Sequence, residues 1–197
     1  MVIIKNKILK EVIDWTKSIL FALVIALFIN VFFIESSRVD GASMLPNLEH
    51  GDRILAIKNN TLFNLDFDYG DIVIVDGDVN HIRTLKDEFR DSSIVSMLTG
   101  NVNEDIWVKR VIGKPGDTLE IKNHKLYRNG SLVKEDYIRE EMTQLNETFK
   151  VPKDHIFVMG DNRNHSGDSR MVGPIPMGNV RAKGLFRFFP FNKIGTL

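Results

Sequence analysis

The chain has 197 residues with 26 basic and 26 acidic side chains, so its formal net charge is zero, and it contains no cysteine. Balanced charge argues against a nucleic-acid-binding protein, which usually carries a basic excess. The lack of cysteine excludes disulfides, thiolate nucleophiles and cysteine-ligated metal sites. The length predicts one domain, or two small ones, with a buried core.

An apolar segment lies near the N-terminus. Residues 15–34 carry one charge, Lys17, and one amide, Asn30. As a helix this segment spans about 30 Å, the hydrocarbon thickness of a bilayer. Because lysines at positions 5, 7, 10 and 17 lie on its N-terminal side, the positive-inside rule predicts cytoplasmic residues 1–14 and an extracytoplasmic domain at 35–197. The expected location is the cell membrane, with a single crossing.

Two other interpretations of this segment compete with a retained anchor. A buried helix of a soluble protein normally has a polar stripe, which residues 19–29 lack. A cleaved secretory signal has a shorter apolar stretch followed by a small-x-small site, whereas Glu35-Ser-Ser-Arg38 follows here. We therefore expect an anchor that stays on the protein.

The rest of the chain is rich in short β-type runs. Alternating or apolar segments bounded by turn residues predict strands at residues 53–58, 71–75, 106–112, 118–133, 155–159 and 183–188. Asn129-Gly130 is a strong hairpin signal. The predicted fold class is mainly β: one membrane helix, then an all-β, mostly antiparallel domain with a hairpin subdomain near 118–150. Within a variable insertion near 76–106, residues 83–97 have helical spacing.

A serine follows the anchor closely. Ser43 stands between a small residue and Met44, and an extended chain from Ile34 would keep it within about 30 Å of the membrane surface. An ordinary loop serine is the plain interpretation of this residue by itself. To act as a nucleophile, its hydroxyl would need a base.

The candidate base is a lysine. The five histidines show no recognisable triad pattern. Lys109 lies in the apolar run 106–112, and burial there would lower its pKa and so favour a neutral amine that accepts protons. The same alternation equally allows Lys109 to be the exposed member of a half-buried strand.

A polar segment at residues 159–174 holds Asp161, Ser166, Asp168 and Arg170 close together. It is either a solvated loop or a hydrogen-bonded shell that supports a site. Its spacing does not match a calcium-binding EF-hand, and no closing glutamate follows. We therefore expect no metal here.

Four segments in chain order resemble the bacterial type I signal peptidases of the Gram-positive type, which are membrane-bound serine endopeptidases with a Ser–Lys dyad. Any one segment is weak, but four in order after a correctly oriented anchor are specific. The segments are Gly41-x-Ser43-Met44-x-Pro46-x-Leu48 with Gly51-Asp52, Gly70-Asp71-Ile-Val-Ile-Val75, Lys109-Arg-Val-Ile-Gly-x-Pro-Gly-Asp117, and Gly160-Asp-Asn-Arg163 with Ser166-x-Asp168-Ser-Arg170.

The resemblance implies a role for each matched residue. Ser43 would be the nucleophile and its backbone N–H an oxyanion donor, with Lys109 as the general base. Ser166 would hydrogen-bond and orient the lysine amine, and Met44 would line the site near the substrate. The remaining supporting residues would hold the polar loop in place: Asp161, Asp168 and Arg170.

The resemblance also implies an activity and partners. The chain would remove signal peptides with small-x-small cleavage sites from exported preproteins at the outer face of the cytoplasmic membrane. It would need no cofactor and no metal. Its partners would be preprotein signal peptides and the lipid bilayer, with no nucleic acid.

Some positions depart from the family pattern or match nothing in it. Gly41 stands where some members have a serine that completes the oxyanion hole, so the second donor stays open, and Asn47 stands where threonine is frequent. Residues 78–105 match no named pattern. Four phenylalanines near the C-terminal end either fill the core or form a patch that touches lipid: Phe186, Phe188, Phe189 and Phe191.

Three other functions compete with a peptidase. A catalytically silent relative would assist surface-protein or pilus assembly, but both dyad residues are present here. A self-cleaving repressor-type Ser–Lys protein would carry a helix-turn-helix segment and no anchor, the reverse of this chain. An anchored binding module would leave a buried lysine without a purpose.

Overall fold

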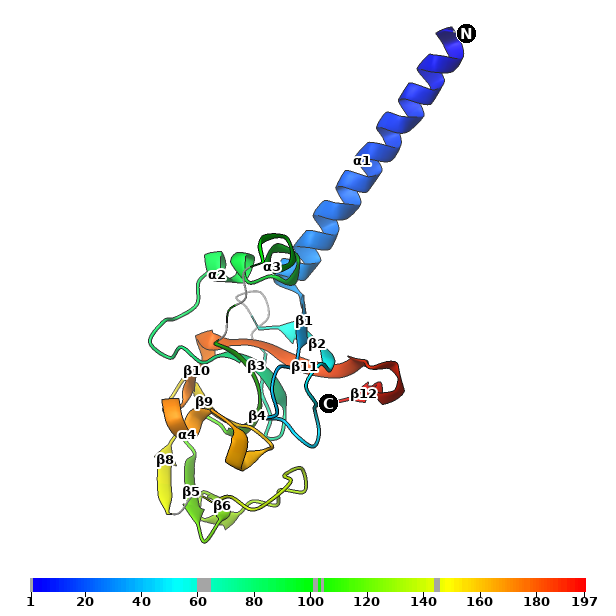
Figure 1. Ribbon diagram of the computed structural model, residues 1–197. Helices are drawn as coiled ribbons and strands as arrows, with labels where there is room; N and C mark the ends of the chain where they lie inside the picture. The colour runs from blue at the N-terminus through cyan, green and yellow to red at the C-terminus, as the bar shows by residue number, and fades with distance from the viewer. Residues whose placement is uncertain (1, 60–64, 101–102, 104, 144–145) are drawn as a thin grey trace.

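The computed structural model describes residues 2–59, 65–100, 103, 105–143 and 146–197. Helix α1 (Val2–Phe32) projects from a β domain (Figure 1). Its segment Leu9–Phe32 is long and apolar enough to cross a membrane, and it is not buried against the rest of the chain. The helix ends before Ile34, the predicted end of the anchor, because Ile34 already pairs with Ile57 in a sheet.

Within the described residues the strands form two antiparallel sheets. The larger has the order β1-β2-β11-β3-β4-β9-β10, with β12 on β11, and the smaller has the order β7-β6-β5-β8. The antiparallel, mainly β architecture is the one predicted. The strand bounds are β1 Ile34–Arg38, β2 Arg53–Lys58, β3 Ile72–Asp76, β4 Ile106–Gly113, β5 Thr118–Lys122, β6 Lys125–Arg128, β7 Ser131–Leu132, β8 Glu147–Lys150, β9 His155–Met159, β10 Ile175–Pro176, β11 Val180–Phe189 and β12 Gly195–Thr196.

Strand β3 lies in the middle of the larger sheet, between β11 and β4. All five of its residues are buried, which explains why its sequence is nearly continuously apolar rather than alternating. Next to it, β4 pairs Lys109 with Val73 and Arg110 with Ile72. One apolar cluster lies under the segment that carries Ser43 and holds that segment to the sheet. It consists of Val39, Met44, Leu48, Ile54, Ala56, Ile72, Ile74, Val108 and Ala182.

The smaller sheet contains two tight turns, one of them at the predicted Asn129-Gly130 pair. Asn123 and His124 link β5 to β6, and Asn129 and Gly130 link β6 to β7. All four have positive φ angles, from 51° to 79°, which matches the backbone that two-residue hairpins require. The hairpin prediction for residues 118–133 is confirmed.

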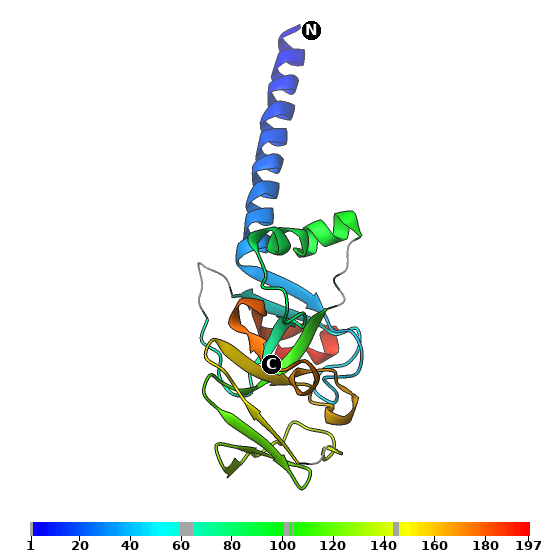
Figure 2. The same cartoon turned by 90° about the vertical axis from the view of Figure 1, so that its left-hand side faces the viewer.

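The predicted single helix at 83–97 is two helices, α2 (Leu85–Arg90) and α3 (Ser93–Thr99). The break has a local cause, because Ser92 takes an extended backbone and begins α3 as its N-cap. Both helices lie at the foot of α1 (Figure 2). A short helix α4 (Ser169–Val172) was not predicted, and three 3₁₀ turns complete the described helices: η1 Arg163–His165, η2 Met177–Asn179 and η3 Phe191–Lys193.

Candidate active site

The structure brings Ser43 and Lys109 together. They lie 66 positions apart in the chain, and the Lys109 Nζ atom is 2.8 Å from the Ser43 Oγ atom. Ser43 is on a turn that follows β1, while Lys109 is on β4. The contact therefore depends on the tertiary fold, and it joins a partly exposed hydroxyl to a lysine that is only 4% exposed.

The environment of Lys109 disfavours the charged amine. Burial lowers its pKa from the ordinary 10.5 to about 8, an effect that the nearby Asp168 and Asp161 charges oppose and the Arg170 charge reinforces. The Trp107 ring lies with its centroid 5.8 Å from Nζ and forms one wall of this environment. The interpretation of Lys109 as an exposed strand residue is therefore wrong.

The polar segment near the C-terminal end fixes the backbone around Ser43. The Asn162 backbone N–H donates to the Ser43 carbonyl at 2.9 Å, and the Asn162 side-chain amide donates to the Ala42 carbonyl at 3.0 Å. Gly160 allows this close approach, because a Cβ there would lie 2.5 Å from the Ser43 carbonyl and 2.3 Å from Ser166 Oγ. Sequence reasoning did not assign Asn162 or Gly160 a role, although both stand inside the fourth matched segment.

Gly160→Ala is expected to displace the Ser43 segment, because the added methyl would meet the Ser43 backbone. Forcing a methyl into a packed site costs about 1–3 kcal/mol of unfolding free energy. Cleavage should fall on the order of 100-fold, the loss associated with a nucleophile moved by about 1 Å. The matched control is Gly167→Ala, whose methyl would meet only Met171 Sδ, at 3.9 Å. Equal activity in the two variants would contradict this prediction.

Asp168 and Arg170 form the ion pair that the resemblance implies. The Arg170 Nε atom lies 2.8 Å from Asp168 Oδ1 and its Nη2 atom 2.8 Å from Oδ2, and the carboxylate is fully buried. Burial by itself raises the pKa of Asp168, but the Arg170 hydrogen bonds and charge outweigh it, so the pKa lies below its usual range. Asp168 also accepts from the Gly160 N–H and so connects this pair to the Ser43 segment.

Ser166 does not make the expected contact with the lysine amine in the described hydrogen bonds. Its hydroxyl donates to Asp168 Oδ2 at 2.7 Å, with a longer contact to the Gly167 carbonyl. A buried carboxylate is a stronger acceptor than a neutral amine, which accounts for this choice. Ser166 therefore contacts the residue that holds the loop, and not Lys109.

Asp161 supports the site from the other face of β4. Its two carboxylate oxygens each lie 2.7 Å from the Arg110 guanidinium, in a bidentate pair that is largely buried. The Asn47 side-chain amide donates to the same carboxylate at 2.8 Å. Asp161 thus links β4 to the segment that carries Ser43, through an arginine whose contribution sequence reasoning did not recognise.

A cavity of about 360 Å³ lies beside the dyad. Gly41, with φ +80°, is among its lining residues, whereas Met44 is fully buried in the cluster beneath. Met44 therefore lies next to the site but does not line this cavity, contrary to the expectation. The lining residues are Arg38, Val39, Asp40, Gly41, Ser43, Ile106, Trp107, Val108 and Lys109.

Comparisons with known proteins identify the family. The family described as signal peptidase, peptidase S26, matches residues 12–189. The chain belongs to this family. Signal peptidase I of Bacillus licheniformis is 36% identical over 92% of this chain and 90% of its own length. Signal peptidase I S of Bacillus subtilis is 34% identical over 94% of this chain and 93% of its own length. A solved signal peptidase I from Enterococcus faecalis is 26% identical, with a TM-score of 0.44, over 60% of this chain and 97% of that one.

The family assignment confirms the resemblance seen in the four segments, and the Bacillus relatives agree with its Gram-positive type. The chain is a membrane-anchored serine peptidase with a mainly β fold. Among the described residues, no group of three or more potential metal-ligating side chains lies together.

Proposed function

We propose that Ser43 and Lys109 are the catalytic dyad of a signal peptidase that cleaves exported preproteins. The observation that carries this assignment is the 2.8 Å separation of Lys109 Nζ and Ser43 Oγ, with the lysine buried and its pKa lowered to about 8. A lysine with such a pKa is partly neutral near pH 7–8 and can take a hydroxyl proton. An accessory role in pilus assembly would not need this geometry.

The reaction proceeds in two steps. As the neutral Lys109 amine takes the proton, Ser43 Oγ attacks the scissile carbonyl, and the Ser43 N–H donates to the oxyanion. The Lys109 ammonium then protonates the departing amine, which leaves an acyl ester on Ser43. In the second step Lys109 takes a proton from water as the water attacks the ester. The bond between the acyl carbon and Ser43 Oγ then breaks, Lys109 gives the proton to Ser43 Oγ, and the signal peptide leaves with a free carboxylate.

The surroundings of the dyad support a substrate with small residues next to the cleavage site. The cavity beside Ser43 is about 360 Å³ and runs between residues 38–43 and 106–109. Trp107 lines one side of the cavity, next to Lys109. Signal peptides carry small residues at the first and third positions before the cut, just past an apolar core. Their cleavage sites therefore fit this location.

The proposed orientation has the N-terminus in the cytoplasm and the β domain outside the cell. Its support is the placement of four lysines on the N-terminal side of the span and the start of the β domain directly after Phe32. Cleavage would then take place where the signal peptide leaves the membrane on the outer face.

The experiment that tests the function is cleavage of an Ala-x-Ala preprotein by the purified full chain in detergent. Ser43→Ala and Lys109→Ala should each remove the activity and leave the fold intact. The matched controls are Ser131→Ala and Lys150→Ala, which change exposed residues of the smaller sheet and should leave the rate unchanged. Retention of cleavage by either dyad variant would refute the assignment.

The C-terminal phenylalanines support a lipid contact for the β11–β12 hairpin. None of the four is buried: Phe189 and Phe191 are exposed and touch each other edge to face, with ring centroids 5.6 Å apart. The double change Phe189→Ala and Phe191→Ala is expected to slow cleavage of a bilayer-embedded preprotein severalfold. The rate of cleavage of a short soluble peptide should not change. Leu132→Ala, at an exposed position of β7, is the control. Equal losses on both substrates would argue against lipid contact.

A further inference from the structure

The two short helices of the insertion expose an unusual amount of apolar surface. On the helices, Leu85, Phe89 and Leu98 are 67%, 52% and 80% exposed, and Ile82, which precedes α2, is 66% exposed. All four lie within 17 residues of the chain, and none takes part in the active site. Such a concentration on a soluble surface indicates a contact with another apolar phase or partner.

The position of α2 relative to the anchor indicates what covers this surface. The last turns of α1 and one side of α2 together line an apolar cavity of about 300 Å³, and α3 also contacts α1. The residues that line the cavity are Val24, Leu27, Phe28, Val31, Phe32, Leu85, Glu88 and Phe89. The exposed apolar surface of α2 is therefore continuous with the segment that crosses the membrane.

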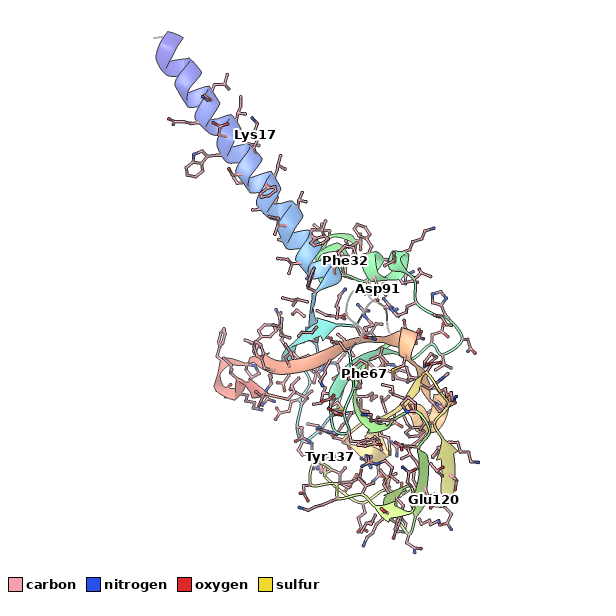
Figure 3. The ribbon with its side chains drawn as sticks, turned by 180° about the vertical axis from the view of Figure 1, so that it is seen from behind. Lys17, Phe32, Phe67, Asp91, Glu120 and Tyr137 are labelled. Carbon is pink, nitrogen blue, oxygen red and sulfur yellow. The ribbon has the colours of Figure 1, made fainter. Side chains whose placement is uncertain are left out.

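The length of the span places part of this contact at membrane depth. The apolar segment of 24 residues is about 36 Å long, against about 30 Å of hydrocarbon. From Val24 to Phe32 the cavity follows about 12 Å of the helix axis. At least half of that length falls inside the hydrocarbon or its boundary. In Figure 3 Phe32 marks this end of α1, with Asp91 just below it and Glu120 at the far end of the molecule.

The charges of α2 are arranged to suit a lipid surface. Its acidic side chains turn inward: Asp87 accepts from Thr84, and Glu88 pairs with the buried Lys58. Lys86 and Arg90 stay exposed, and Arg90 also pairs with Asp87 at 3.2 Å and with Asp91 at 2.9 Å. A short helix with exposed apolar side chains and basic side chains beside them resembles helices that lie in the headgroup region.

Buried ion pairs connect this element rigidly to the catalytic sheet. The Arg83 guanidinium lies 2.7 Å from Asp76 at the end of β3 and 3.0 Å from Asp91 after α2. Arg181 of β11 pairs with Glu35 of β1 at 3.0 Å and reaches Asp91 at 3.7 Å. Because β3 pairs directly with β4, these ion pairs connect α2 to the sheet that carries Lys109.

We propose that α2 and α3 form a membrane contact beside α1, separate from the contact of the β11–β12 hairpin, and that it lies in the headgroup region of the leaflet nearest the β domain. α1 anchors the chain, while this contact fixes the tilt of the β domain and the height of Ser43 above the bilayer. The occupant of the apolar surface is lipid. The inference is independent of the peptidase assignment, because it needs only the anchor and the contacts of α2 and α3.

A depth measurement tests the proposal without using activity. The chain has no cysteine, so Phe89→Cys, Leu98→Cys and the control Leu132→Cys each accept one fluorescent label. The labelled full chains are placed singly in nanodiscs of phosphatidylcholine and phosphatidylglycerol. We expect a quencher attached near the lipid headgroup to reduce emission at 89 and 98 at least twofold more than at 132. We expect aqueous iodide to show the reverse order.

Two results would overturn the proposal. The labels at 89 and 98 would respond like the label at 132 if the helices stand in water. They would resist both quenchers if protein, and not lipid, covers them. A loss of cleavage in Ser43→Ala has no bearing on either result, so failure of this proposal and failure of the peptidase assignment are distinguishable.

A functional readout complements the depth measurement. The double change Leu85→Ser and Leu98→Ser should lower cleavage of a bilayer-embedded preprotein on the order of tenfold. Without the membrane contact, the height of Ser43 above the bilayer no longer matches that of the scissile bond. Cleavage of a short soluble peptide in detergent should stay within twofold of the unchanged chain. Equal rates on the embedded substrate would contradict the proposal.

Discussion

Replacement of Lys109 by methionine is expected to lower cleavage on the order of 10³-fold and, at pH 6, to stabilise the fold. The loss of activity follows from removal of the group that takes the Ser43 proton, since general-base catalysis contributes about 10²–10⁴-fold. The gain in stability follows from burial, because methionine fills similar space without a charge to desolvate. The variant is therefore expected to lose activity while it gains stability. A lysine with a purely structural role would not show this combination.

The size of the stabilisation depends on pH in a defined way. The pKa of Lys109 is about 8 in the folded chain and 10.5 ordinarily, so below pH 8 folding carries a penalty of about 3 kcal/mol for the buried charge. Between pH 8 and 10.5 the folded lysine is neutral and the unfolded one still charged, so the penalty shrinks. Above pH 10.5 it is gone.

Thermal unfolding in detergent at pH 6 and at pH 10.5 measures this difference between Lys109→Met and the unchanged chain. The stabilisation should be present at the lower pH and absent at the higher one. Lys150→Met, a change of an exposed lysine on β8, should alter neither. Destabilisation by Lys109→Met at pH 6 would show that the lysine is charged and well paired in the folded state.

Asp161→Ala is expected to lower the free energy of unfolding by about 3–5 kcal/mol. The change leaves the Arg110 guanidinium buried without its bidentate partner and removes the acceptor for Asn47. Because Asn47 lies four residues from Ser43, cleavage should fall as well. Urea unfolding in detergent gives the first quantity, and the preprotein assay gives the second.

The double variant Arg110→Met with Asp161→Leu separates an unpaired charge from lost packing. Replacement of both partners by apolar residues removes the desolvated charge, so the double variant should recover at least half of the stability that Asp161→Ala loses. As a surface control, Asp136→Asn breaks the exposed pair with Lys134 and should cause no measurable change. A double variant as unstable as Asp161→Ala would contradict the explanation.

Local patterns predicted most of the elements. Continuous apolar residues identified the anchor helix, and alternation with turn pairs such as Asn129-Gly130 identified the hairpins. Strand β1 was not predicted, because its sequence Ile-Glu-Ser-Ser-Arg has no strand pattern of its own. It becomes a strand by pairing with β2. The helical stretch 83–97 was placed well, but its division at Ser92 follows from a cap that the broad spacing conceals.

The sequence predicted which residues belong to the site, because they stand in family patterns. It did not predict their burial and hydrogen-bond partners, which depend on the tertiary fold. The alternation of apolar and polar residues did not decide whether Lys109 is buried or exposed. The pairing of β4 with its neighbouring strands buries the lysine. Asn162 and Gly160 stand in the fourth matched segment, but their contacts are with Ser43, more than 100 positions away, so the segment alone did not indicate their roles. Ser166 was assigned to the lysine amine, whereas the competing acceptor Asp168 takes its hydroxyl.

The pH dependence of kcat/KM for preprotein cleavage tests the central claim most directly. The claim is that a neutral Lys109 activates Ser43, so kcat/KM should rise about tenfold per pH unit below pH 8 and level off above it, with a midpoint near the Lys109 pKa of about 8. The measurement uses a substrate without titrating groups near the cleavage site. A profile that is flat from pH 6 to 9, or that has its midpoint near the histidine value of about 6.5, would contradict the claim.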